Sequence, residues 1–463
     1  MLFNSYPFVG FLLVTLFVYY LPLARRFQLL SLILASFYFY AFLKPILLVL
    51  LLASILFNTS VSWVLERNSP KRWVTLGVIF NLLLLCFFKY ASLIAKTFID
   101  ESSSNDLSSF ILSIPLPIGI SFYTFEGISL LVDSYRGKTS STKVTGKTFI
   151  EHLIETTHFV SFFPHLIAGP ILKAHDFYPQ IKTKYLKDID WNSAFKNVVI
   201  GFFLKMVVAD NLKEYTGYMS YPYFENLSSP TLIILMLGYS CQIFADFAGY
   251  SLIAIGIAKL FGYDLPTNFN YPYISQSFSE FWQRWHISLS TWLKEYLYIP
   301  LGGNRNGNNR TYLNLFLVML LGGLWHGAGW NYAVWGMIHG VALGLERLLI
   351  TSKEGATTWL KCLRVGMVFL IVTIAWLFFK LPNFTQALLY IQKMGTNWHL
   401  PFIPGIREVY VLIFCMAVAL YHLYYLWKGE RQFPKLEMIL LAIMLFFIMT
   451  NSGFQGDFIY FQF

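Results

Sequence analysis

The feature that most constrains this chain is a succession of apolar runs, most of them long enough to cross a bilayer core of about 30 Å. Hydrophobic residues make up 56% of the 463 residues and charged residues only 13%, about half the charged share of a soluble domain. Because unpaired backbone groups are costly in lipid, such spans must be helical. The sequence therefore predicts an all-α integral membrane protein. It excludes a disordered chain, a collagen-like fibre and a small disulfide scaffold.

The apolar runs predict about eleven membrane segments. They lie at 6–23, 27–43, 45–65, 73–95, 109–133, 194–209, 231–262, 312–323 with 331–350, 357–380, 408–427 and 436–450. Proline and glycine interrupt several runs, so we also expect re-entrant and interfacial helices. The chain shows no repeat of fixed period and no separate soluble domain. We therefore interpret residues 1–463 as one polytopic domain with a C-terminal tail at 451–463.

Loop charges predict the orientation of the chain. The pair Arg25 and Arg26, the segment 67–72 and the segment 136–147 are basic, and the serine-rich run 100–106 (DESSSND) is acidic. Basic loops face the cytoplasm, so we expect the N-terminus and the C-terminal tail on the outer side. The net charge of +10 is concentrated in these short loops, so we expect no binding of nucleic acid.

The segment 277–300 (SFSEFWQRWHISLSTWLKEYLYIP) combines a helix start with an aromatic stripe. Ser277 and Glu280 have the spacing of a capping box. Apolar residues then follow at spacings of three and four: Phe278, Trp282, Trp285, Leu289, Trp292 and Tyr296. This pattern predicts a helix lying in the membrane interface. His286 borders the stripe, and helix geometry alone favours an interfacial histidine beside tryptophans over a catalytic one.

The next segment, 301–310 (LGGNRNGNNR), is rich in glycine and asparagine. Its side chains Arg305 and Arg310 could bind phosphate groups. The alternative is a flexible turn between membrane elements. The segment lacks the GxGxxG pattern and a preceding strand, so it is not a dinucleotide-binding fingerprint.

The segment 321–330 (LGGLWHGAGW) places His326 among glycines inside an apolar stretch. Glycine lets another backbone or a ligand approach closely, and an ionisable side chain at membrane depth indicates function by default. The alternative is a neutral histidine that bridges two helices. Three further polar groups in apolar surroundings, Glu126, His165 and Asp246, are interpreted as helix-bridging residues.

A membrane histidine of this kind suggests a general base for a hydroxyl group that attacks an activated acyl group. Its unperturbed pKa near 6.5 keeps imidazole largely neutral at about pH 7. A thioester such as acetyl-CoA needs no metal, and the four cysteines have no paired spacing. We therefore expect neither a metal site nor a disulfide.

Several motifs together resemble the membrane-bound O-acyltransferase superfamily, and the resemblance runs over nearly the whole chain. They are PIGISFYTF at 117–125, PHLIAGPI at 164–171, NFNYP at 268–272, FWQRWH at 281–286, IPLGGNR at 299–305 and LWHGA at 324–328. The IPLGGNR and LIAGPI forms favour the bacterial alginate and peptidoglycan O-acetylation branch. The resemblance implies a ring of tilted helices around a tunnel, with a cytosolic entrance for acyl-CoA.

The same resemblance implies roles for individual residues. His326 matches the family's near-invariant histidine, and His286 matches a second signature position that holds Asn or His in relatives. We interpret both as candidate catalytic residues. The candidate residues for binding the acetyl-CoA donor are Arg284, Gly302, Gly303, Asn304, Arg305 and Trp325.

The chain ends in FIYFQF at 458–463, which resembles a Phe-x-Tyr-x-x-Phe motif of bacterial acyl-transfer systems in this superfamily. There the tyrosine is thought to carry the acyl group, so Tyr460 is a candidate relay nucleophile. A phenol with a pKa near 10 is a poor nucleophile alone, but a base can activate it. The alternative is an ordinary aromatic tail at the headgroup layer.

The resemblance also implies the reaction and its setting. It predicts an acetyltransferase of the bacterial inner membrane, with acetyl-CoA as donor, no permanently bound cofactor and both termini periplasmic. A separate periplasmic, hydrolase-like transferase would place the acetyl group on peptidoglycan or an alginate-like exopolysaccharide. Two alternatives stay open: D-alanyl transfer onto teichoic acid, and a transporter for a lipid-linked sugar.

Overall fold

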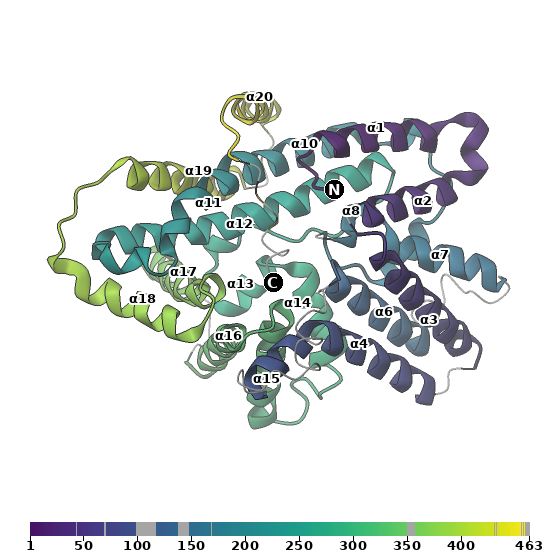
Figure 1. Cartoon of the computed structure of the whole chain (residues 1–463), viewed down its shortest axis with the longest axis horizontal. Helices are drawn as coiled ribbons and strands as arrows, with labels where there is room; N and C mark the ends of the chain where they lie inside the picture. Colours follow the sequence, from purple (N-terminus) through teal and green to yellow (C-terminus); the bar gives the residue numbers. More distant parts are fainter. Residues whose placement is uncertain are drawn as a thin grey trace. The chain divides into compact units, whose positions relative to one another are not determined.

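A computed structural model describes residues 1–42, 44–68, 71–98, 117–137, 148–167, 169–349, 357–429, 431, 433–454, 456 and 458. Every regular element among these residues is helical (Figure 1), which confirms the all-α prediction. The chain forms two compact units. Unit 1 contains Met1–Val198 and Ile253–Pro266, and unit 2 contains Val199–Leu252 and Thr267–Phe463.

Unit 1 is built from helices of the N-terminal part of the chain. They are α1 (Tyr6–Tyr20), η1 (Pro22–Phe27), α2 (Gln28–Ala41), α3 (Leu47–Asn68), α4 (Lys71–Phe98), α6 (Ile120–Arg136), α7 (Phe149–Ser161), α8 (Phe163–Leu166), α9 (Ala174–Phe177), η3 (Tyr178–Gln180), η4 (Leu186–Asp188), most of α10 (Trp191–Phe202) and the end of α12 (Ser229–Leu260).

Unit 2 contains the longer C-terminal set. It comprises the π-helical segment η5 (Phe203–Ala209), α11 (Asp210–Thr216), η6 (Gly217–Met219), η7 (Tyr223–Asn226), most of α12, η8 (Pro272–Ile274), α13 (Phe278–Arg284), α14 (Ile287–Leu293), the π-helical segment η9 (Lys294–Tyr298), α15 (Asn308–His326), α16 (Trp330–Leu349), α17 (Thr358–Lys380), α18 (Phe384–Thr396), η10 (Asn397–His399), α19 (Ile406–Lys428) and α20 (Pro434–Thr450).

Six helical stretches are long and apolar enough to cross a membrane, counted over the described residues only. They are Leu47–Arg67, Lys71–Ala91, Trp191–Met219, Ser229–Leu260, Thr358–Lys380 and Ile406–Lys428. This is fewer than the predicted number of segments, although nearly every predicted run is helical where it is described. The acidic run 100–106 and almost all of the basic run 136–147 lie outside the described residues.

Two buried carboxylates of α6 face histidines inside unit 1. The Nδ1 atom of His165 is 3.0 Å from a carboxylate oxygen of Glu126, and both side chains are fully buried. The Nδ1 atom of His175 is 2.6 Å from the carboxylate of Asp133. The first pair joins α6 to α8, which confirms the helix-bridging interpretation of Glu126 and His165. In the second pair, the hydrogen bond to Asp133 raises the pKa of His175.

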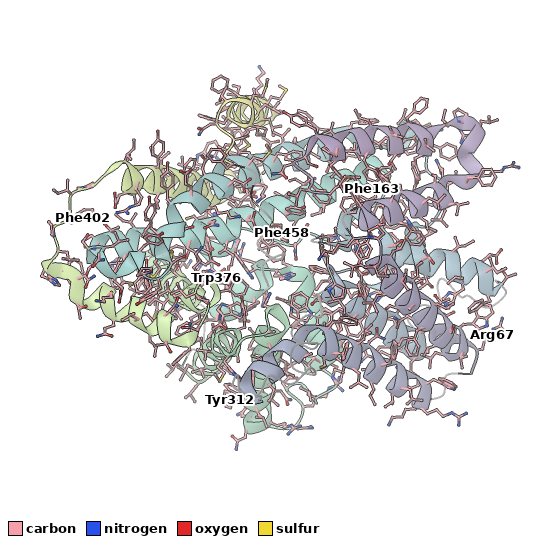
Figure 2. All side chains as sticks on the ribbon, in the orientation of Figure 1. Arg67, Phe163, Tyr312, Trp376, Phe402 and Phe458 are labelled. Carbon is pink, nitrogen blue, oxygen red and sulfur yellow. The ribbon has the colours of Figure 1, made fainter. Side chains whose placement is uncertain are left out.

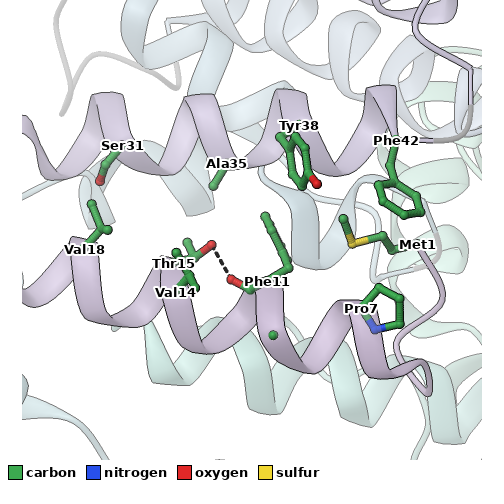
Figure 3. Close-up of a pocket in the computed structure, with 11 residues that line it drawn as sticks. Met1, Pro7, Phe11, Val14, Thr15, Val18, Ser31, Ala35, Tyr38 and Phe42 are labelled. Carbon is green, nitrogen blue, oxygen red and sulfur yellow. Dashed lines mark hydrogen bonds between the residues drawn. The ribbon is translucent and has the colours of Figure 1, made fainter.

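An apolar groove of about 640 Å³ lies between α1 and α2 (Figure 3). Phe11, Val14 and Tyr38 are among its lining residues. Its one labelled hydroxyl on α1, that of Thr15, donates to the carbonyl of Phe11 in the preceding turn. The lining is therefore largely hydrocarbon, which suits a helix pair in contact with lipid.

The segment 277–300 corrects one prediction. It is not a single interfacial helix, because the chain breaks at Trp285 and His286 between α13 and α14. His286 has a φ of +46°, a left-handed conformation that no helix interior contains. The aromatic stripe is also buried, with Trp285 only 2% exposed. The predicted N-cap is present, since the Glu280 amide donates to the Ser277 hydroxyl at 3.1 Å.

Candidate active site

Close packing of α15 against α16 places His326 at the end of a tight helical hairpin (Figure 1). A Cβ atom added to Gly323 would lie 2.3 Å from the carbonyl oxygen of Tyr332, and one added to Gly336 would lie 2.3 Å from that of Met319. Only glycine allows the two backbones to approach so closely. Gly323 and Gly336 therefore allow the backbones of α15 and α16 to pack closely. His326 is the last residue of α15.

A buried amide fixes the other side of the hairpin. The side chain of Asn331, at the start of α16, donates to the carbonyl oxygens of Phe378 at 3.0 Å and Leu381 at 3.1 Å. These carbonyls lie at the end of α17, where a helix has no backbone donors left for them. Asn331 thus satisfies the end of α17 and holds the turn that follows His326.

His326 lies among aromatic rings and is 3% exposed. Its ring centroid is 5.1 Å from Trp325, 5.1 Å from Trp335 and 5.4 Å from Phe379. We call these three rings the aromatic chamber. Trp376, labelled in Figure 2, stacks on Trp335 at 5.4 Å and extends the chamber. The surroundings are apolar, so a polar interaction formed with His326 during a reaction is strengthened by the low dielectric.

The ring of His286 lies 6.2 Å from that of His326, measured between centroids. Its Nδ1 atom is 3.1 Å from the side-chain oxygen of Asn268. The backbone amide and the hydroxyl of Ser288 also donate to that oxygen, at 3.3 and 2.9 Å. Because a carbonyl oxygen only accepts, the hydrogen of His286 is on Nδ1, which leaves the lone pair on Nε2.

Burial determines the charge of His286. The side chain is fully buried, and burial lowers its pKa to about 3. A group desolvated in this way stays neutral near pH 7. A neutral ring beside His326 does not repel a proton, so His326 can accept one without a like charge close by.

The loop 301–305 is a tight turn at the opposite end of α15. Gly302 and Gly303 have φ values of +103° and +56°, which favour glycine. Asn314 donates to the carbonyl oxygens of Leu301 and Gly303, at 3.3 and 2.9 Å. His326 is twelve residues further along α15 than Asn314, which corresponds to about 18 Å. The loop and His326 are thus well separated.

The structure separates the predicted site residues into groups. His286, His326 and Trp325 lie together in the chamber region. Asn304 and Arg305 are exposed on the distant loop with Gly302 and Gly303.

Arg284 stabilises the local fold, because its guanidinium donates to the carboxylate of Glu280 at 2.9 Å and the carbonyl of Asn270 at 3.0 Å. Tyr460 lies outside the described residues.

Two residues in this region were not predicted. Asn268 orients His286 from eighteen positions away; it begins the motif NFNYP, but no role in the site was predicted for it. Lys205 is fully inside an apolar helical stretch and pairs with Asp246 at 2.7 Å, which confirms that Asp246 bridges helices. A lysine within a predicted span is a signal that could have been used.

Comparison with known proteins identifies the family. The model of the membrane-bound O-acyltransferase family matches residues 19–381. A probable alginate O-acetylase from Pseudomonas aeruginosa is 40% identical over 415 residues, which cover 86% of this chain and 76% of that protein. A peptidoglycan O-acetyltransferase from Helicobacter pylori is 38% identical, covering 79% and 73%.

A teichoic acid D-alanyltransferase from Bacillus subtilis is 30% identical but covers only 49% of this chain and 58% of that protein. The family match confirms the resemblance seen in the motifs. The matched residues include both His286 and His326. This chain is a multi-pass membrane protein and an O-acyltransferase that belongs to the membrane-bound O-acyltransferase family.

Proposed function

We propose that this enzyme takes acetyl from cytosolic acetyl-CoA and moves it through the bacterial inner membrane for O-acetylation of a cell-envelope polysaccharide. The acceptor would be peptidoglycan or an alginate-like exopolysaccharide. The observation that carries the proposal is His326, buried in the aromatic chamber beside a neutral His286. The names of the relatives support acetyl as the group transferred.

The donor would reach the chamber from the loop 301–305. Coenzyme A carries its thioester at the end of a long flexible arm, while its phosphates need polar or cationic partners. Arg305 is exposed at this loop, and Asn314, which binds the loop, is about 18 Å from His326 along α15. In this proposal the nucleotide binds at the cytosolic loop and the arm follows a tunnel to His326.

In the first step, His326 acts as general base. It takes the phenolic proton of Tyr460, and the tyrosine oxygen attacks the thioester carbonyl carbon. The new C–O bond forms as the C–S bond breaks. The leaving thiolate takes the proton from His326, which releases free CoA and leaves acetyl-Tyr460. Neutral His286 lines the site and keeps the neighbourhood free of positive charge.

The position of Phe458 supports a role for the tail. This side chain is fully buried and contacts Phe247, whose ring is in turn 4.6 Å from that of His286. Tyr460 follows two residues later. In the second step, a polysaccharide hydroxyl would attack acetyl-Tyr460 and regenerate the phenol. A periplasmic hydrolase-like transferase would catalyse that step if the tail faces the periplasm.

Release of free CoA by the purified protein tests the proposal. We expect acetyl-CoA to be consumed with release of CoA, whereas a transporter would release none. The remaining alternative, D-alanyl transfer, would use a carrier protein as donor instead. Adding a D-alanyl-loaded carrier protein to the acetyl-CoA reaction therefore separates the two. If the carrier inhibits CoA release, the choice of acetyl as the transferred group is contradicted.

A further inference from the structure

The chain after α20 packs against η5 and α11. The amide of Gly453 donates to the carbonyl oxygen of Met206 at 2.9 Å, and the side chain of Asn211 donates to that of Asn451 at 2.9 Å. Both partners belong to the stretch formed by η5 and α11. The first part of the tail therefore lies along this stretch.

The tail continues into the interior. Phe458 is fully buried, and its ring lies 4.4 Å from that of Tyr250 and 5.9 Å from that of Phe247 (Figure 2). Both partners are on α12, and Phe247 also contacts His286. The tail thus approaches the region of the two histidines.

A buried ammonium group holds the tail between these two points. The Nζ atom of Lys205 is 2.7 Å from carboxylate oxygens of both Asp210 and Asp246, and 3.3 Å from the carbonyl oxygen of Gly456. The Lys205 side chain is 2% exposed. An ammonium has three donors, so two can bind the helices and the third can bind the tail backbone.

The local backbone aims Lys205 in this direction. Lys205 is within the π-helical segment η5, where the amide of Asp210 bonds to the carbonyl of Lys205, five residues back. A π-turn widens the helix by one residue and is frequent at functional sites. It brings the Lys205 and Asp210 side chains onto one side of the helix, where the tail passes.

The tail also requires small residues at its points of closest approach. A Cβ atom added to Gly453 would lie 2.7 Å from backbone atoms of Asn211 and Asp210. One added to Gly456 would lie 3.0 Å from the Asp210 carboxylate and from the Nζ atom of Lys213. The contacts at Gly453 force a shift and those at Gly456 are tight, so the path of the tail depends on Gly453 as well as on Lys205.

We propose that Lys205 is a positioning residue, whose ammonium group joins Asp210, Asp246 and the carbonyl of Gly456 and so directs the tail toward the site of His286 and His326. The effect of Lys205 on acetyl transfer rests on the proposed function, whereas its contact with the tail does not. Lys205 acts through the tail, because its ammonium group contacts α11, α12 and the tail backbone. Without the Lys205 ammonium group, we expect the segment after Gly456 to be no longer held in one position against α12.

Carboxypeptidase digestion followed by mass spectrometry tests the position of the tail without reference to catalysis. In the wild type and in Lys205→Arg, which keeps the charge, we expect digestion to stop before Phe458 is removed. In Lys205→Met, digestion continues past Gly456. Lys89→Met, which removes a buried ammonium from unit 1, leaves the tail protected. Equal protection of the tail from digestion in the wild type and in Lys205→Met would contradict the proposal that Lys205 holds the tail.

A second variant covers the case in which Lys205→Met does not fold. Gly453→Ala leaves every buried charge in place and inserts one methyl group into the contact with α11. We expect it to release the tail in the same assay. Gly395→Ala is the matched control, because a Cβ atom there would meet nothing within 4 Å. A tail equally protected in both alanine variants would contradict the proposed path.

The kinetic test separates positioning from donor binding. Lys205→Met should form acetyl-Tyr460 about 10²-fold more slowly than the wild type, the scale of a misplaced reacting group. The KM for acetyl-CoA should stay unchanged, and Lys205→Arg should recover part of the rate. A released tail with an unchanged rate of CoA release would overturn the positioning role. If the tail is released in Lys205→Met but the wild type forms no acetylated tyrosine, the proposed function is refuted. The role of Lys205 in holding the tail is then still supported.

Discussion

Two histidines of unit 1, His165 and His175, and two of unit 2, His286 and His326, have different surroundings. In unit 1, His165 and His175 each face a carboxylate, at 3.0 and 2.6 Å. In unit 2, His286 faces the neutral amide of Asn268, and His326 lies among aromatic rings. The same side chain is thus placed beside a carboxylate in one unit, and beside a neutral amide or aromatic rings in the other.

The difference teaches what each set can do. A carboxylate favours imidazolium, and the hydrogen bond to Asp133 raises the pKa of His175. Burial without such a charge lowers the pKa of His286 to about 3. A histidine paired with a carboxylate is suited to joining helices, whereas a neutral ring is suited to accepting a proton during a reaction. The comparison assigns structure to the first set and chemistry to the second.

The largest effect is expected for His326→Ala, which removes the proposed base. We expect the rate of CoA release to fall about 10²–10⁴-fold, the contribution of general-base catalysis. His286→Ala should keep part of the activity, since His286 supports the site without taking the proton. The measurement is free thiol released per minute by monodisperse protein. Equal losses in the two folded variants would refute this ranking.

Glu126→Ala should act on stability in unit 1. It leaves His165 buried without its carboxylate, and breaking such a pair costs about 3–5 kcal/mol. Thermal unfolding in detergent measures the loss. The double variant Glu126→Leu with His165→Phe should recover much of it, because an apolar pair can replace a buried ionic one. A loss of CoA release with unchanged unfolding would instead show that this pair is catalytic.

Asn268→Ala sharpens the comparison inside unit 2. It removes the acceptor that keeps the hydrogen on Nδ1 of His286, at a cost of about 1–3 kcal/mol. If this energy is lost from the transition state, kcat falls about tenfold to a hundredfold. We expect little change in KM. Asn268→Asp should make the loss pH-dependent, because a carboxylate raises the pKa of His286. Activity of that variant then falls as the pH drops, and a flat pH profile would refute the role of Asn268.

The smallest effect is expected for Asp133→Asn. The folded-state pKa of His175 is raised, so its contribution is fully present below the unfolded pKa of about 6.5 and is lost as pH rises through the folded value. For a pair that is partly exposed on the His175 side, we expect a loss of about 1 kcal/mol at acidic pH and less at alkaline pH. Thermal unfolding at the two pH values measures the loss. An equal loss at both would show that the carboxylate acts without charge.

The sequence predicts the helices better than it predicts the site. Apolar periodicity locates spans such as α12 and α17, and the motif LWHGA identifies His326. It misses the break at His286, because one left-handed residue does not disturb an apolar-aromatic stripe. It also misses Asn268, whose role exists only once the chain brings it beside His286. Pairing across long sequence separations depends on tertiary packing, which local patterns do not encode.

The most direct test of the account is mass spectrometry of the C-terminal peptide after incubation with acetyl-CoA. The samples are the wild type, His326→Ala and Tyr460→Phe. We expect an acetyl group on Tyr460 in the wild type, and none in either variant. CoA release by the wild type without any acetylated tyrosine would refute the relay. An acetylated Tyr460 in His326→Ala at the wild-type rate would contradict the central claim that His326 is the base.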